Sequence, residues 1–136
     1  MLVYIAGPYG GKSRFGLIRF FQVLLNIWRA RRVAVQLWAK GFVAICPHLN
    51  TFLMDNVCQR ERFLEGDLEI LKHCDALVTA GEWFDSEGTR GEIDFAGEHN
   101  IPVFHGVGAY LDWDGALRRL AGRCDNTQPG KCTFDE

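Results

Sequence analysis

The feature that most constrains the fold is an alternation of short apolar runs with longer segments of helical periodicity. The apolar runs are rich in β-branched and aromatic residues, which is typical of buried strands. They cover Leu2–Ala6, Phe42–Cys46, Asp75–Ala80 and Ile101–His105. Because apolar residues elsewhere recur at helical spacing, we expect helices over Leu17–Lys40, Phe52–His73, Thr89–His99 and Asp114–Gly122. Strands and helices that alternate in this order predict βαβ units and a parallel sheet.

The predicted class is therefore α/β: a three-layer sandwich in which a parallel, flavodoxin- or Rossmann-like sheet of four to five strands lies between helices. The 136 residues fit a single domain over 1–136. Residues 123–136 are largely polar and are expected to form a loosely ordered tail. In the first helix, the residues expected to face the core are Ile27, Ala30, Ala34, Leu37 and Trp38.

The net charge and the number and spacing of the cysteines argue against several classes of protein. A net charge of −2 argues against a nucleic-acid polymer as partner and against a polybasic membrane binder. The apolar run Leu17–Trp28 is too short to span a bilayer and contains Arg19. The 5 cysteines are odd in number and no pair has CxxC spacing, so neither a disulfide framework nor a zinc ribbon is indicated. No signal peptide is visible, and we expect a reducing, cytoplasmic setting.

In a parallel sheet the loops that follow the strands share one edge, and ligands bind there. This rule selects Gly7–Gly11, Pro47–Thr51 and Gly81–Gly88 as candidate binding segments. The first continues as GPYGGKS, which is similar to the phosphate-binding P-loop GxxxxGKS/T. Ala6 stands where the first glycine of that motif belongs, so NTP hydrolysis is not expected. The glycines would still let backbone N–H groups approach a phosphate or a sugar, and a simple tight turn explains them equally well.

The third segment leads into a helix and carries Ser86-x-Gly88-x-x-x-Glu92. Ser86 and the N–H groups of Gly88 and Thr89 would lie at the helix N-terminus, where an anion binds favourably. Glu92 falls one turn into the helix, and its carboxylate could point into the same cleft. A first-turn carboxylate stabilised by the helix dipole is the plainer interpretation of Glu92 taken alone.

Other polar residues have equally plain structural explanations. Asp67 lies on a predicted helix, where carboxylates usually face water. His48 and Asn50 follow Pro47 at the ligand edge, and no second His or Cys stands at metal-ligand spacing, so no metal is assigned. Trp83 could stack on a planar base or could equally belong to the core.

Taken together, these residues resemble a known family. The motifs that carry the resemblance are Tyr4-Ile5-Ala6-Gly7-Pro8, Asn26–Ala30, Cys46–Thr51, Asp67–Asp75, Gly81-x-Trp83 and Ser86-x-Gly88-x-x-x-Glu92. Their combination resembles the nucleoside 2-deoxyribosyltransferase superfamily. That superfamily includes transferases, 2′-deoxynucleoside 5′-monophosphate N-glycosidases, and small uncharacterised phage and bacterial proteins. The chain is most similar to the last group, and the resemblance covers roughly Leu2 to Phe104.

The resemblance implies a role for each catalytic residue. Glu92 matches a nucleophilic glutamate that attacks C1′ of the sugar. Asp67 matches an aspartate that helps to protonate the departing base, and Tyr4 matches a tyrosine that contacts the nucleophile. Ser86 stands where the transferases carry an aspartate that holds sugar hydroxyls, whereas a serine in this loop of the monophosphate hydrolases binds the 5′-phosphate. The expected substrate-binding residues are Gly7, Pro8, Tyr9, Gly10, His48, Asn50, Trp83, Ser86 and Gly88.

The function implied is cleavage or transfer of the N-glycosidic bond of (2′-deoxy)nucleosides or their 5′-monophosphates, without a cofactor. The alternative is a non-catalytic module that binds or senses a nucleotide in the same cleft. The partner is then a small nucleoside or nucleotide, and neither a nucleic-acid polymer nor a membrane is expected. The resemblance also implies a homodimer or larger homo-oligomer in the cytoplasm of a bacterium or phage-infected host cell. The aromatic and basic segment Lys12–Leu25 could be a lid, a dimer contact or extra helix.

Overall fold

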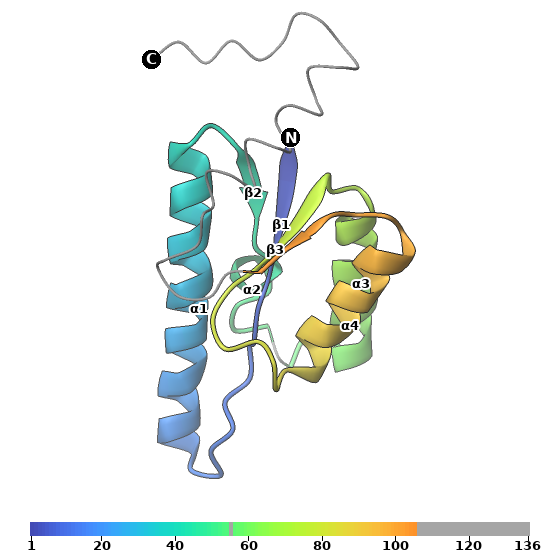
Figure 1. The fold of residues 1–136 in the computed structure, drawn as a ribbon. Helices are drawn as coiled ribbons and strands as arrows, with labels where there is room; N and C mark the ends of the chain where they lie inside the picture. The colour runs from blue at the N-terminus through green and yellow to red at the C-terminus, as the bar shows by residue number, and fades with distance from the viewer. Residues whose placement is uncertain (55, 106–136) are drawn as a thin grey trace, which may run out of the picture.

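The structure of the chain, a computed structural model, describes residues 1–54 and 56–105. The helix expected over Asp114–Gly122 and the tail expected over 123–136 lie outside the described residues. The elements, which Figure 1 labels, are β1 (Leu2–Ala6), α1 (Gly16–Ala39), β2 (Val43–Ile45), α2 (Pro47–Asn50), α3 (Arg60–Lys72), β3 (Ala76–Thr79), α4 (Glu87–Glu98) and β4 (Val103–Phe104).

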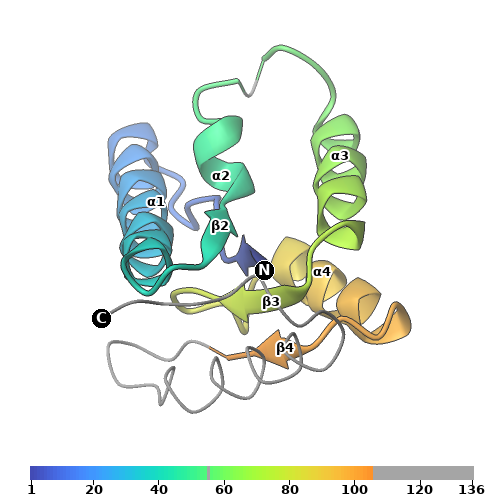
Figure 2. The same ribbon diagram turned by 90° about the horizontal axis from the view of Figure 1, so that it is seen from above.

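All four strands belong to one parallel sheet with the order β2-β1-β3-β4. Each strand is connected to the next through at least one helix, as parallel neighbours require. In Figures 1 and 2, α1 lies on one side of this sheet, and α3 and α4 lie on the other. The prediction of an α/β sandwich with a parallel sheet is therefore confirmed.

Strand β1 is buried on both faces, because successive side chains of a strand point to opposite sides of the sheet. Val3 and Ile5 belong to the core cluster that α1 covers. Tyr4 and Ala6 belong to the cluster that α3 and α4 cover. This alternation brings the side chain of Tyr4, the polar residue of the strand, to the same side of the sheet as α4.

Helix α1 buries only a narrow stripe of its surface. Ile27, Ala30, Ala34 and Leu37 are buried as predicted, but Trp38 is 56% exposed. Trp38 follows Leu37 directly, so its side chain lies about 100° further round the helix and faces away from the sheet. The prediction that Trp38 faces the core is therefore wrong.

The segment before α3 differs most from the predicted structure. A helix was expected from Phe52, but α3 begins only at Arg60. Leu53 has a φ of 61°, in the left-handed region, and Gln59 has extended backbone angles. Val57 is exposed, so this stretch offers no buried stripe that would stabilise a helix. The short helix α2 forms instead where a loop was expected, and it begins with Pro47, whose fixed φ suits the first helical position.

The loops after β1 and β3 are in contact at the carboxyl edge of the sheet. The N–H of Ala80 donates to the carbonyl of Ala6 at 2.7 Å. A Cβ atom placed on Gly7 would come within 2.9 Å of the Ala80 carbonyl oxygen, a distance that real Cβ atoms essentially never show. The chain's own backbone therefore requires glycine at position 7, before any ligand is considered.

Candidate active site

A cleft of about 710 Å³ opens at the carboxyl edge of the sheet. Its walls come from the loops after β1 and β3, from the segment around α2, and from α1, α3 and α4. The residues that the sequence singled out and that line it are Gly7, Pro8, Tyr9, Gly10, His48, Asp67, Ser86, Gly88 and Glu92. Side chains that are remote in the chain, above all Asp67 and Glu92, thus converge on one cavity.

Glu92 lies at the buried floor of the cleft. It is only 6% exposed and projects from α4 toward the central strand. The hydroxyl of Tyr4 donates to Oε1 of Glu92 at 2.6 Å, a distance typical of a charge-assisted hydrogen bond. Oε2 of Glu92 has no hydrogen-bond partner among the described residues. One carboxylate oxygen is therefore held by the sheet, and the other is buried without a partner at the cleft that Glu92 lines.

Burial sets the protonation of both acids. It raises the pKa of Glu92 to about 7; the hydrogen bond from Tyr4 opposes this increase, and the charge of Asp67 adds to it. Burial also raises the pKa of Asp67 to about 6. Because the two pKa values lie this close, the pair holds about one proton near neutral pH, so one carboxyl group is ionised while the other can donate.

Tyr4 stays protonated throughout this range. Its burial, followed by the charge of Glu92, raises the pKa of the phenol far above its ordinary value. The hydroxyl is consequently a permanent donor to Glu92. Tyr4 is absent from the cleft lining and reaches the site only through this hydrogen bond.

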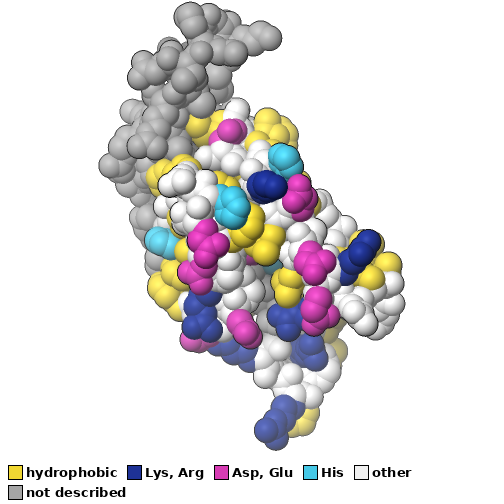
Figure 3. Space-filling view, turned by 90° about the vertical axis from the view of Figure 1, so that its right-hand side faces the viewer, with side chains coloured by type: hydrophobic (Ala, Val, Ile, Leu, Met, Phe, Trp, Pro, Cys, Tyr) yellow, Lys and Arg dark blue, Asp and Glu magenta, His cyan; other side chains and the backbone are white. Residues whose placement is uncertain are grey.

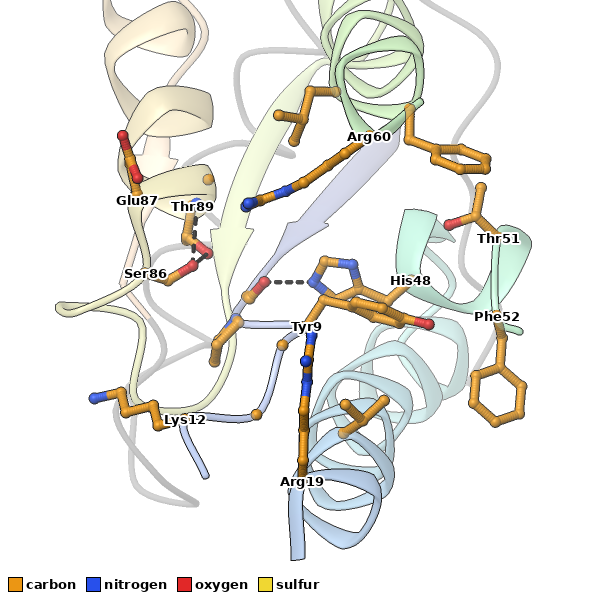
Figure 4. Close-up of a pocket in the computed structure, with 18 of the residues that line it drawn as sticks. Tyr9, Lys12, Arg19, His48, Thr51, Phe52, Arg60, Ser86, Glu87 and Thr89 are labelled. Atoms are coloured by element: carbon orange, nitrogen blue, oxygen red, sulfur yellow. Dashed lines mark hydrogen bonds between the residues drawn. The ribbon is translucent and has the colours of Figure 1, made fainter. Parts of the chain in front are cut away.

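His48 is held as a neutral hydrogen-bond donor to the glycine-rich loop. Its Nε2 is hydrogen-bonded to the carbonyl of Gly7, as the dashed line in Figure 4 shows, and a carbonyl can only accept. Burial lowers the pKa of the imidazole, although the bond to Gly7 opposes that shift. The ring of Tyr9 lies 5.4 Å from that of His48, tilted by 48°. The proton on Nε2 leaves Nδ1 as an acceptor.

Ser86 caps the N-terminus of α4. Its Oγ accepts from the backbone N–H of Thr89 at 3.3 Å and from the Thr89 hydroxyl at 2.9 Å. A serine hydroxyl that accepts twice keeps its own hydrogen for a further acceptor. The cap residue of a helix that lines the cleft can therefore still donate into it, as the sequence pattern suggested.

The rim of the cleft carries basic side chains that the sequence analysis missed. Lys12 pairs with Asp85 at 2.8 Å and joins the loop after β1 to the loop after β3. Arg19 from α1 and Arg60 from α3 also line the cleft, and both are drawn in Figure 4. The placement of Lys12 could have been inferred from its position in the glycine-rich segment. Nothing in the local pattern marks Arg60, because its direction depends on where α3 begins.

Two expected substrate-binding residues do not line the cleft. Asn50 is exposed at the end of α2 and is absent from the lining. Trp83 is stacked between Phe84, with ring centroids 4.2 Å apart, and His105, at 4.7 Å. Its ring is therefore engaged in an aromatic stack of the protein itself, and the structure gives no support for a role in stacking on a base.

Within residues 1–54 and 56–105, no three His, Cys, Asp or Glu side chains are grouped so that they could hold a metal ion. No helix in the same part of the chain is long and apolar enough to cross a membrane.

Comparison with known proteins adds a family and a fold. A family described as Domain of unknown function (DUF7768) matches residues 1–105, most of the chain. The chain belongs to this family. The matched range of the DUF7768 domain ends at the last residue that the structure describes and contains every residue of the cleft. No curated protein matches the chain.

The DUF7768 domain is similar in structure to a 2-deoxyribosyltransferase from the psychrotolerant bacterium Bacillus psychrosaccharolyticus. The TM-score is 0.52 and the sequence identity 21%, and the match covers 82% of this chain and 77% of the other. A similarity at this level of identity shows the fold. The resemblance to the nucleoside 2-deoxyribosyltransferase superfamily noted in the sequence is therefore confirmed as a shared fold.

Proposed function

We propose that the DUF7768 domain cleaves or transfers the N-glycosidic bond of (2′-deoxy)nucleosides or their 5′-monophosphates, with Glu92 as the nucleophile. The observation that carries this proposal is the convergence of Asp67 and Glu92, from different helices, on one cleft. The shared fold with a 2-deoxyribosyltransferase supports the same reaction class.

The reaction requires an ionised Glu92 and a protonated Asp67. Breaking the bond from C1′ to the base nitrogen leaves an electron-poor sugar carbon and gives the bonding electron pair to the base. The free Oε2 of Glu92 forms a bond to C1′ from the opposite face, while Asp67 transfers its proton to the departing base. A raised pKa of about 6 keeps that proton on a larger fraction of Asp67 near neutral pH than for an ordinary aspartate.

The second half of the reaction regenerates both groups. A water molecule, or the nitrogen of a second base, attacks C1′ of the covalent intermediate and displaces the carboxylate of Glu92. Asp67, now ionised, takes the proton that the attacking atom loses. Tyr4 stabilises the departing carboxylate through its hydrogen bond to Oε1, and so acts as a positioning residue.

The test is base release from a panel of the common deoxynucleosides and deoxynucleoside 5′-monophosphates. The wild-type protein should release free base, and Glu92→Ala should lower the rate about 1000-fold or more. Glu98→Ala, an exposed glutamate on the same helix, is the matched control and should be as active as wild type. Equal activity of Glu92→Ala and wild type would exclude the proposed nucleophile. Addition of a second base then distinguishes transfer from hydrolysis.

A non-catalytic nucleotide-binding module is the second candidate, and the protonation of Glu92 favours it. With a pKa of about 7, Glu92 is only partly ionised at neutral pH and is a correspondingly weaker nucleophile. Tight calorimetric binding of a nucleotide without release of base at any pH would decide for this alternative.

We also propose that the protein is a cytoplasmic homo-oligomer that acts on small molecules. Helix α1 supports an interface between copies, because its outer face exposes large apolar side chains, including Phe21 at 60% and Trp28 at 53%. The described cysteines, Cys46, Cys58 and Cys74, are free, which fits a reducing compartment. Light scattering of the purified protein measures the oligomeric state, and Trp28→Glu should shift it toward the monomer.

A further inference from the structure

The glycine-rich loop, residues 7–13, forms one wall of the cleft and lies against helix α1. Its first residue, Gly7, is held by the bond to His48 and by its close approach to the loop after β3. In Figures 1 and 2 the segment between β1 and α1 runs alongside the N-terminal half of that helix. Residues 7–12 of the loop line the cleft. Contacts that fix the loop on α1 therefore also fix a wall of the candidate active site.

Two amide side chains of α1 hold the backbone of this loop. Oε1 of Gln22 accepts from the N–H of Ser13 at 3.0 Å. Nδ2 of Asn26 donates to the carbonyl of Gly10 at 3.3 Å. Gln22 and Asn26 are four residues apart, so they are neighbours on one face of the helix. One amide acts as an acceptor and the other as a donor, and together they match both kinds of backbone group on the loop.

These two amides are unusual in the sequence of α1. The helix contains no aspartate, glutamate, serine or threonine, and its amide side chains are Gln22, Asn26 and Gln36. Asparagine is a weaker helix former than leucine, the residue at the two positions before Asn26. Neither Gln22 nor Asn26 lines the cleft. Any effect of these two side chains on a ligand must therefore pass through the loop.

Gly11 allows the loop to approach α1 this closely. A Cβ atom at position 11 would lie 2.7 Å from the carbonyl oxygen of Arg19 and 2.8 Å from Oε1 of Gln22. Both atoms belong to α1, and the helical carbonyl cannot move aside as the end of a flexible side chain can. The contact with α1 therefore excludes every side chain larger than that of glycine at position 11.

The contact also fixes the orientation of the loop backbone. The described residues contain no cis peptide bond, and in a trans peptide the C=O and the next N–H point in opposite directions. Because the carbonyl of Gly10 is directed at Asn26, the N–H of Gly11 points away from Asn26. The bond to Asn26 therefore determines which backbone groups of the loop are presented on its other side.

We propose that Gln22 and Asn26 are positioning residues that dock the glycine-rich loop onto α1, and that this docking sets the affinity of the cleft for its substrate. The part of the inference that concerns affinity rests on the proposed function, because the substrate is the one named there. A loop that leaves α1 removes one wall of the cleft, so only the docked state binds the substrate fully. The measured affinity then falls with the docked fraction.

Trypsin tests the docking without any ligand, because Lys12 and Arg14 are exposed cleavage points in and beside the loop. The rate of cutting follows the undocked population, since the segment must leave α1 to enter the protease. Gln22→Met and Asn26→Asp each lose one hydrogen bond and should be cut at these two bonds about 3-fold to 10-fold faster. Gln22→Glu keeps an acceptor and should be cut like wild type. Gln36→Met removes the third amide of the helix and is the matched control.

The affinity is tested with the panel of deoxynucleosides and deoxynucleoside 5′-monophosphates. Gly11→Ala prevents docking and should raise KM or Kd about 10-fold or more. It should change kcat less than about 3-fold, because Asp67 and Glu92 lie on other helices. The amide variants should raise KM or Kd by less, in the order of their trypsin rates. Gly97→Ala, at an exposed glycine of α4 where a Cβ meets nothing within 4 Å, should behave like wild type.

The outcomes separate this inference from the proposed function. Wild-type cleavage rates in both Gln22→Met and Asn26→Asp would overturn the docking, and so would equal effects of Gln22→Met and Gln22→Glu. Faster cleavage with unchanged KM and Kd, in Gly11→Ala as well, would overturn the link to affinity. If no compound of the panel releases base, the proposed reaction fails, and the trypsin rates with the calorimetric Kd still decide the role of the two amides.

Discussion

Glu92 and Asp85 are both carboxylates at the carboxyl edge of the sheet, but one lies on the floor of the cleft and the other on its rim. Burial raises the pKa of Glu92 to about 7. Asp85 is exposed, and its pKa is lowered by the hydrogen bond and charge of Lys12. Figure 3 shows many of the charged side chains on the α3–α4 side gathered toward its lower end, Lys and Arg among Asp and Glu.

The buried floor and the exposed rim of the cleft have different roles. A buried acid with a perturbed pKa can exchange a proton or attack a substrate near neutral pH, at a cost in stability. An exposed ion pair is screened by water and adds little to stability, but it can help to hold two loops together. We therefore expect substitutions on the floor to have large effects on rate or folding, and substitutions on the rim to act mainly on ligand choice.

The largest expected effect is on the pH dependence of the rate. If Glu92 must be ionised and Asp67 protonated, the rate should follow a bell with apparent pKa values near 6 and 7 that belong to the pair. Activity should fall about tenfold per pH unit beyond either limb. Asp67→Asn should remove the alkaline limb and leave a single acidic limb that belongs to Glu92 alone. A profile without a bell, or an unchanged alkaline limb in Asp67→Asn, would contradict these roles.

A second test is a pair of glycine substitutions in the loop after β1, one at a buried and one at an exposed position. Gly7→Ala brings a Cβ within 2.9 Å of the Ala80 carbonyl oxygen, whereas a Cβ on Gly10 meets nothing within 4 Å. Gly7→Ala should lower the free energy of unfolding by about 2 kcal/mol or more, and Gly10→Ala should change it by less than about 0.5 kcal/mol. Urea denaturation measures both; equal stabilities would show that the two loops are not packed as described.

Removing the buried charge should stabilise the fold at alkaline pH. The folded pKa of Glu92, about 7, exceeds its ordinary value of 4.5, so the folded state binds the proton more tightly and stability falls as pH rises between these values. Glu92→Gln abolishes this loss and should be more stable than wild type by about 3 kcal/mol at pH 8 and by little at pH 4.5. Glu98→Gln, on the exposed face of α4, should show no such pH-dependent gain in thermal unfolding.

The smallest effect is expected on the rim. Lys12 and Asp85 are both about three-quarters exposed, at 75% and 76%. Lys12→Ala and Asp85→Asn should leave the midpoint of thermal unfolding unchanged within error, at low and at high salt. A clear loss of stability in either variant would mean that the pair of Lys12 and Asp85 stabilises the fold. That result would contradict the proposed difference between the rim and the floor.

The parts of the fold that the sequence predicted are those with a strong local period. The four strands and α1 follow from apolar runs and helical spacing, and Ser86 at the start of α4 follows from the preference of serine for the helix cap. Glu92 was found only because its motif resembles a family, since its burial against Tyr4 depends on strand pairing that no local pattern shows.

The parts that could not be predicted depend on tertiary contacts. The helix expected from Phe52 instead begins at Arg60, and this shift turns Arg60 from a mid-helix residue into the first residue of α3, on the wall of the cleft. Trp83 was ambiguous between ligand and core, and only the stack with Phe84 and His105 decides how its ring is used.

The hydrogen bond between Tyr4 and Glu92 depends on the register in which β1 pairs with its neighbouring strands. Tyr4 is registered against Ile45 of β2 and Leu77 of β3. A slip of β1 by one residue would turn the phenol to the α1 side and leave Glu92 without its anchor. For protein engineering, any graft near the start of the chain must therefore keep β1 in frame.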